Sequence, residues 1–200
     1  MSRPSRRVAK IAAIAAVPAA LIASGLIVGQ ASYSAYSATT VNPTSNWASG
    51  TVALSDDDNN TAAFNATNLQ PGSTGTKCIV VTSTGTLAST VKLYGTAPTS
   101  TKGLASNINL TITQGSGGTF AGGCDKFVAA EKDPAVFAGT LDGFGTTFTG
   151  FSNGAGVWAQ TGNGSESRTF KITYTVNDKA PNTTQGGTAA IGFTWEAQNS

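Results

Sequence analysis

Histidine, the side chain that most often moves protons in enzymes, is absent from this 200-residue chain. Nucleophilic sites of the Ser-His-Asp and Cys-His types need an imidazole as base, and zinc sites of the HExxH type need two histidine ligands. The two cysteines, Cys78 and Cys124, are too few for a structural zinc site. We therefore expect a protein that is not an enzyme, with no catalytic residues, no metal and no cofactor.

Carboxylates offer the remaining chemistry. Glu131, Glu166 and Glu196 are the only glutamates, and a glycosidase built on two carboxylates stays formally open. The run from Asp56 to Asp58 could bind Ca²⁺ through oxygen atoms, but it lacks the glycine and the distal glutamate of an EF-hand loop. The alternative is a solvated turn, and the sequence leaves this choice open.

The first 34 residues have the features of an export signal. Its basic residues are Arg3, Arg6, Arg7 and Lys10. An apolar run follows over residues 11–28, and Ser32 and Ser34 supply the small side chains expected before a cleavage point, which we place between Ser34 and Ala35. A retained membrane anchor is the alternative, because about 18 apolar residues is close to the shortest bilayer span. We expect a secreted protein, in the extracellular matrix or at the cell surface.

The charge of the exported part argues against nucleic acid as a partner. Removing the leader takes four of the 12 basic residues and leaves eight against ten acidic ones, so no basic surface is expected. Contact with a membrane is expected only through an uncleaved leader.

Two cysteines in an exported chain suggest one disulfide. It would tie the strand around Cys78 to the glycine-rich loop at Cys124. Closing a loop of this length stabilises a protein by roughly 4 kcal/mol in the chain-entropy model. Two separate buried thiols are the alternative, because pairing cannot be derived from the sequence.

The periodicity of the apolar residues predicts an all-β fold. Charged residues make up only 11% of the chain, and short alternating runs rich in Thr, Val and Phe are separated by turn residues. The predicted strands are Thr51–Leu54, Ala62–Leu69, Lys77–Thr82, Thr90–Tyr94, Ile108–Ile112, Ser167–Asn177 and Thr188–Ala197. We expect one domain over residues 48–200, a two-sheet antiparallel sandwich of jelly-roll or Greek-key type.

Turn and aromatic residues predict the connections. Gln70-Pro71-Gly72 predicts a tight turn, because Pro fixes φ at the first corner and Gly accepts a positive φ at the second. Residues 95–106 predict a loop, and residues 126–132 are open between a strand and a helical turn. In residues 134–153, Phe and Leu recur every three or four positions, but each interspersed glycine would cost about 1 kcal/mol in a helix. We expect a short helix or 3₁₀ turn there, covering a sheet edge.

Residues 35–47 form an extended N-terminal segment of polar composition. From Ala35 onward its only large apolar side chains are Tyr36, Val41 and Trp47, too few for the segment to order itself alone. It is either a frayed terminus or a donor strand. A donor strand completes the sheet of the next subunit through main-chain hydrogen bonds and pockets for alternate side chains.

Several short stretches carry a resemblance to a known family. They are Ala48–Leu54, Phe64-Asn65 with Asn68–Gly72, Thr76-Lys77, Thr84–Leu87 and, near the end, Ile191–Ala197. In their order and spacing the chain resembles the TasA/camelysin family of secreted bacterial proteins, which build extracellular fibres of the biofilm matrix. The resemblance implies a leader removed by a dedicated signal peptidase. It also implies polymerisation through the N-terminal segment, with Ala35, Tyr36, Val41 and Trp47 as the polymerisation residues.

The resemblance therefore implies a secreted structural subunit whose partner is itself, in a homopolymer, together with other matrix or cell-wall components. A monomeric surface adhesin that uses its loops as a binding module is the alternative. A secreted protease is a remote third reading: camelysin-like relatives carry a metalloprotease label, but no residue of this histidine-free chain supports it.

Overall fold

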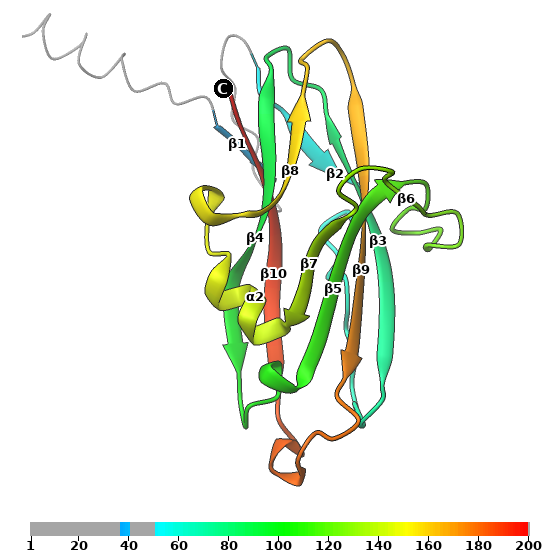
Figure 1. Ribbon diagram of the computed structural model, residues 1–200, viewed down its shortest axis with the longest axis vertical. Helices are drawn as coiled ribbons and strands as arrows, with labels where there is room; N and C mark the ends of the chain where they lie inside the picture. The colour runs from blue at the N-terminus through cyan, green and yellow to red at the C-terminus, as the bar shows by residue number, and fades with distance from the viewer. Residues whose placement is uncertain (1–36, 41–50, 200) are drawn as a thin grey trace, which may run out of the picture. The chain divides into compact units, whose positions relative to one another are not determined.

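Antiparallel strands form two sheets in the computed structural model, which describes residues 51–199 and, for the backbone alone, residues 37–40 (Figure 1). The four-stranded sheet has the order β1-β10-β4-β8, and the six-stranded sheet has the order β2-β3-β9-β5-β6, with β7 also paired to β5. The strands are β1 (Ser37–Thr40), β2 (Leu54–Asp56), β3 (Thr74–Ser83), β4 (Ser89–Ser100), β5 (Ile108–Ser116), β6 (Val128–Ala129), β7 (Ala135–Thr140), β8 (Ala155–Gln160), β9 (Glu166–Val176) and β10 (Ala189–Asn199). The helical segments are η1 (Ala105–Asn107), α2 (Leu141–Thr147), η2 (Phe151–Asn153) and η3 (Asn182–Thr184).

The chain crosses repeatedly from one sheet to the other. Strands β3 and β9 of the six-stranded sheet lead into β4 and β10 of the four-stranded sheet, and β4 and β8 lead back into β5 and β9. Every pair of neighbouring strands is antiparallel among the residues described. Crossovers of this kind wrap a sandwich in the jelly-roll manner. The predicted all-β, two-sheet fold with a short helix is confirmed.

Alternate side chains of the long strands fill the space between the sheets. In β5, Leu110 and Ile112 are 2% and 0% exposed, as their strict alternation with polar residues predicts. In β9, Phe170 and Ile172 are 3% and 0% exposed. The ring of Phe170 lies 5.3 Å from that of Trp195 in β10, so the two sheets meet in one core. The predictions of these three strands are confirmed.

Helix α2 packs beside β4 and β7 and closes one side of the core. The side-chain oxygen of Thr140 accepts a hydrogen bond from the N–H of Gly143 at 3.0 Å and so caps the start of the helix. Phe144 is fully buried, and its ring lies 5.0, 5.4 and 5.7 Å from the rings of Phe137, Phe148 and Phe193. The predicted short helix is confirmed.

The prediction of a strand over residues 62–69 is wrong. This segment has no regular secondary structure. Asn60, just before the segment, has φ 65°, and Asn68, near its end, has φ 55°; a regular strand without a bulge does not accommodate that left-handed conformation. The tight turn that follows is confirmed: the N–H of Ser73 donates to the carbonyl of Gln70 at 2.9 Å, and Gly72 has φ 81°.

Strand β4 runs further than predicted, through residues 95–100, where we expected a loop. A bulge makes this possible: Ala97 has φ 46°, and the pairing register with β10 shifts opposite it, so that the strand passes Pro98 without a break. Strands β7 and β8 were not predicted at all. The ambiguous residues 126–132 contain the two-residue strand β6.

The predicted first strand is shorter than expected and begins at Leu54. The residues just before this strand still make backbone hydrogen bonds. The carbonyls of Thr51 and Ala53 accept from the N–H groups of Thr86 and Thr84, at 2.7 and 3.0 Å. Among the described helices, none is long and apolar enough to cross a membrane. The predicted leader, with its cleavage point between Ser34 and Ala35, lies outside the described residues.

Candidate functional site

The four-stranded sheet has an edge that is only partly paired. On one side β10 pairs with β4 along its whole length, but on the other side β1 pairs only with the stretch from Trp195 to Gln198. No strand in the described part of the chain pairs with residues 189–194 on that side. A strand edge with unpaired N–H and C=O groups is a template for a further strand.

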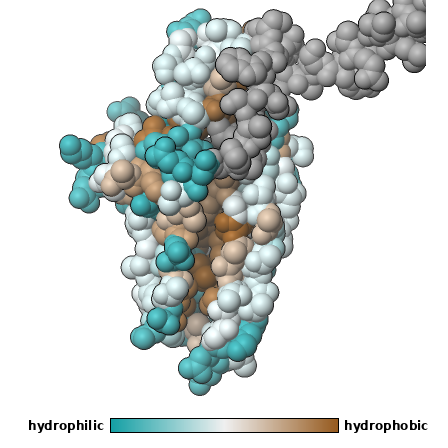
Figure 2. All heavy atoms as spheres, turned by 180° about the vertical axis from the view of Figure 1, so that it is seen from behind, coloured by the Kyte–Doolittle hydropathy of each residue, from teal (hydrophilic) through white to brown (hydrophobic). Residues whose placement is uncertain are grey.

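Beside this open edge lies an apolar groove of about 450 Å³, which we call the edge groove. Residues 189–195 of β10 form one side, and side chains of the six-stranded sheet, among them Leu110 and Tyr174, form the floor. Residues from the segment 58–69, which we call the groove wall, form the other side. A strip of hydrophobic surface runs lengthwise along the face shown in Figure 2, as expected for such a groove.

The groove wall is held mainly at its two ends. At its centre the ring of Phe64 packs edge-on against Tyr174, with ring centroids 5.0 Å apart. After the C-terminal end of the wall, the N–H of Gly72 donates to the carbonyl of Val176 at 3.0 Å. No backbone hydrogen bond joins residues 62–69 to any other described residue. The wall therefore depends on the contacts made just before it.

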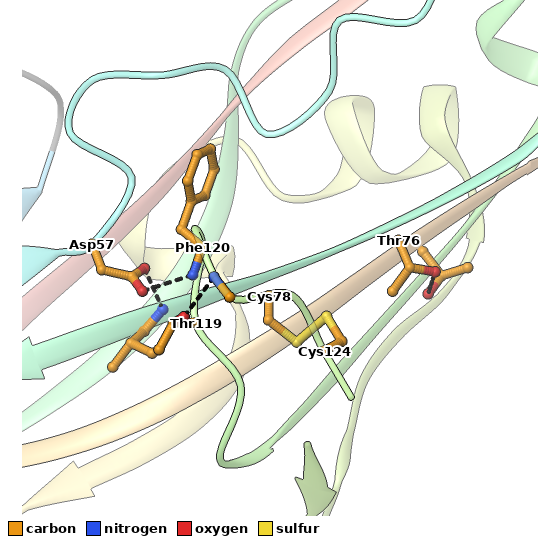
Figure 3. Close-up of a disulfide and its surroundings, with 9 residues drawn as sticks. Asp57, Thr76, Cys78, Thr119, Phe120 and Cys124 are labelled. Atoms are coloured by element: carbon orange, nitrogen blue, oxygen red, sulfur yellow. Dashed lines mark hydrogen bonds between the residues drawn. A yellow bond between two sulfur atoms is a disulfide. The ribbon is translucent and has the colours of Figure 1, made fainter. Parts of the chain in front are cut away.

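Those contacts come from Asp57. The backbone pairing of β2 with β3 ends at Asp56, opposite Val81, and the carboxylate of Asp57 continues it. One oxygen accepts the N–H of Val80 in β3 and the other accepts the N–H of Phe120, both at 2.8 Å (Figure 3). Asp57 thus joins the groove wall, β3 and the loop that carries Phe120.

The other two acidic residues of this run also serve the local structure. The side chain of Asp58 accepts the N–H of Asn60 at 2.8 Å and forms a tight turn. Burial, and then a hydrogen bond and charge repulsion from Asp58, raise the pKa of Asp56 to about 6. Within the described part of the chain, no three His, Cys, Asp or Glu side chains lie together as metal ligands would.

The predicted disulfide between Cys78 and Cys124 is confirmed, with the two Cα atoms 5.4 Å apart (Figure 3). It ties β3 to the loop of residues 117–127, which we call the disulfide loop. Gly118 and Gly123 in this loop have φ of 71° and 77°, conformations that other residues rarely adopt. The Nζ of Lys77 lies 4.0 Å from the centre of the Phe120 ring, so the loop also contacts the edge of β3.

The three glutamates lie on different elements, and none of them lines the edge groove. Glu131 is exposed in the connection between β6 and β7. Glu166 accepts hydrogen bonds from the N–H and the hydroxyl of Thr161, both at 2.7 Å, and these bonds lower its pKa. The hydroxyl of Tyr94 donates to Glu196 at 2.9 Å, and burial followed by this bond raises the pKa of Tyr94 to about 12.

Of the predicted polymerisation segment, only the backbone of Ser37–Thr40 is described. Ala35, Tyr36, Val41 and Trp47 lie outside the described residues. In the described part, β1 pairs with β10 of its own chain, from Ser37 opposite Gln198 to Thr40 opposite Trp195. This arrangement in cis was not among the predicted alternatives.

The edge groove itself was not predicted from the sequence. Its signal is present in hindsight in the uncharged stretch from Ala189 to Trp195, which borders an open edge only because β1 is so short. No protein-family model matches the chain, and no curated protein matches it either. The resemblance to the TasA/camelysin family stays an interpretation of the sequence.

Proposed function

We propose that this protein is a secreted structural subunit that polymerises into extracellular fibres, each copy donating its N-terminal segment to the edge groove of the next. The observation that carries this proposal is the unpaired stretch of β10 beside an apolar groove. An added strand would find backbone groups to pair with on one side and pockets for its side chains on the other. A head-to-tail contact that does not close on itself gives a filament.

The register of β1 argues that the groove suits a segment from a second copy. A strand continued beyond Thr40 in the same register would place Asn42 opposite Phe193 and Thr44 opposite Ile191. Residues opposite each other in a sheet share a face, so polar side chains would meet the apolar groove. A shift of the added strand by one residue relative to β10 reverses its two faces. Val41 and the other odd-numbered residues would then face the groove. A donor from another copy is free to adopt that register.

Chain length also limits what the protein's own segment can fill. Thr51 is hydrogen-bonded to Thr86, three residues before Ser89, and Ser89 is paired with Asn199 at the end of β10. The chain must therefore return to the Asn199 end of the sandwich by residue 51. The far end of the groove, at Ala189, is about 33 Å from Asn199 along the strand.

A strand that followed β10 in cis as far as Ala189 would use the chain up to residue 46. The five Cα–Cα steps from residue 46 to Thr51 span at most about 18 Å. The return needs at least about 18 Å, even if Thr86 lies a fully extended stretch of about 10 Å from Ser89 toward the groove and Thr51 about 5 Å further. The protein's own segment would therefore need a fully extended return to fill the far end of the groove, whereas a strand from a second copy has no such limit.

The test is assembly of the mature chain, from residue 35 onward, followed by negative-stain electron microscopy and sedimentation. Wild type is expected to form filaments. Deletion of residues 35–44 is expected to leave a folded monomer, as judged by circular dichroism. Filaments from the deletion variant would refute the donor mechanism, and a wild-type chain that stays monodisperse at every concentration would favour the monomeric adhesin.

A pair of lysine substitutions separates the groove from the rest of the surface. Ala190 is exposed on the open edge and lines the groove, and Ala138 is exposed on β7, outside it. Ala190→Lys places a charge where the donor strand must pair, and it is expected to raise the critical concentration for assembly at least tenfold. Ala138→Lys is the matched control and is expected to assemble like wild type.

A further inference from the structure

We infer that the Cys78–Cys124 disulfide controls the edge groove through Asp57: the oxidised chain has a formed groove wall that binds a donor strand, and the reduced chain does not. Asp57 is then a positioning residue for donor binding. The inference rests on the proposed function for its partner, a segment of a second copy, but the structural coupling stands on the contacts described above.

The disulfide loop has one covalent attachment to β3 and several non-covalent ones. Its positive-φ glycines allow many conformations, so a free loop would lose much entropy on ordering. Its contacts with the rest of the molecule include the disulfide, the bond from the N–H of Phe120 to Asp57, the packing of the Phe120 ring against the core and under Lys77, and the placement of Lys171 near the Phe127 ring. The disulfide is the only covalent one of these, and it fixes where the Phe120 N–H can lie.

Asp57 transmits this position to the groove wall. Its two oxygens are shared between Val80 and Phe120, so the side chain is held from both sides. If the disulfide loop leaves, one oxygen loses its donor, and the carboxylate can turn toward water. The wall begins at the next residue and has no backbone hydrogen bonds of its own over residues 62–69 to other described residues. Losing Asp57 therefore leaves this end of the wall attached only through the β2–β3 pairing that ends at Asp56 and the packing of Phe64 against Tyr174.

The redox step is ordinary thiol–disulfide exchange. One cysteine, as its thiolate, attacks a small-molecule or protein disulfide and releases one thiol. The second cysteine then attacks the mixed disulfide, closes the Cys78–Cys124 bond and releases the second thiol. Two electrons pass to the oxidant, and the two cysteines lose their protons. A chain in a reducing compartment would thus carry an unformed groove until it reaches an oxidising one.

The experiment measures binding of a fluorescent peptide with the sequence of residues 35–50 to the mature chain, by anisotropy, before and after reduction with dithiothreitol. A hydrogen bond to a carboxylate is worth enough to change an affinity by about tenfold or more. Reduction is expected to weaken peptide binding by about that factor. It should also speed amide exchange in residues 57–64, with β9 unchanged as the control for folding. The double variant Cys78→Ser/Cys124→Ser should behave like the reduced chain.

Asp57→Asn supplies the decisive comparison, because it keeps the disulfide but leaves one acceptor oxygen for the two N–H groups of Val80 and Phe120. It should bind the peptide as weakly as the reduced wild type, and reduction should weaken it no further. Asp125→Asn, in the exposed part of the same loop, is the matched control and should keep the full response to reduction. Equal peptide affinity of oxidised and reduced wild type, or a full redox response in Asp57→Asn, overturns the inference.

The same data separate this inference from the proposed function. If oxidation strengthens peptide binding but no filaments form under any condition, the fibre proposal fails and the redox coupling is upheld. If filaments form equally well from the oxidised and the reduced chain, the coupling is refuted and the fibre proposal is upheld.

Discussion

Substituting Asp56 by asparagine tests the electrostatics at the start of the groove wall. The pKa of Asp56 is about 6 in the folded protein, against 3.8 for the free side chain, because the carboxyl is desolvated and faces Asp58. The folded protein therefore binds this proton more tightly than the unfolded chain does. The stability linked to the proton is complete below about pH 4 and is lost as the pH rises through 6.

The size of the effect follows from the shift and the exposure. The difference between 3.8 and about 6 corresponds to about 3 kcal/mol for a fully desolvated group. Asp56 is only half-buried, so solvent screening reduces this to about 1 kcal/mol. Asparagine keeps the size and the hydrogen-bonding capacity of the protonated acid but does not ionise.

The measurement is urea unfolding of wild type and Asp56→Asn, followed by tryptophan fluorescence between pH 4 and pH 7.5. The free energy of unfolding of wild type should fall relative to that of the variant by about 1 kcal/mol over this range, mostly between pH 4 and 6. Taking the difference removes the titration of all other groups. Asp125→Asn, exposed in the disulfide loop, is the matched control for the loss of one carboxylate. A difference between wild type and Asp56→Asn that does not change with pH would show that Asp56 carries no such shift.

Three further substitutions test the fold around the site. Phe144→Ala should lower the free energy of unfolding by about 3–5 kcal/mol in urea titrations, because it empties a fully buried site; a loss under about 1 kcal/mol would contradict that packing. Thr140→Ala should cost about 1 kcal/mol through loss of the helix cap, and Thr140→Ser should recover most of it. Gly115→Ala should separate β6 from β5, because the added methyl group collides with the carbonyl of Val128; amide exchange at Ala130, which is bonded to β5, should accelerate, and unchanged exchange would count against it.

Local patterns predicted the strands whose two faces differ most. β5 and β9 alternate strictly between apolar and polar residues, and the structure buries the apolar set. The Pro71-Gly72 turn could be predicted from its own residues alone. The helix at Leu141–Thr147 could also be predicted, because Phe144 and Phe148 recur at helical spacing. The burial of these rings stabilises the helix more than the glycine between them destabilises it.

The failures come from conformations that neighbouring residues cannot reveal. Residues 62–69 have the sequence pattern of a strand, but Asn60 just before them and Asn68 within them are left-handed. Pro98 looks like the end of β4, but a bulge accommodates it. The edge groove depends on how far β1 extends along β10, which is a long-range property of the fold. The pairing of Cys78 with Cys124 was expected, but its link to the groove depends on one carboxylate that bonds two distant amides.

The disulfide also closes a covalent ring that contains all of β4 and β5. Strand β4 lies between β10 and β8, and β5 lies between β9 and β6, so both are interior members of their sheets. A protease that cuts the exposed stretch around Lys102, between these strands, severs the chain inside the ring. Both fragments then stay joined through sulfur. Dismantling a subunit by cleavage there takes two events, a cut and a reduction, and a cut alone leaves every strand in its place.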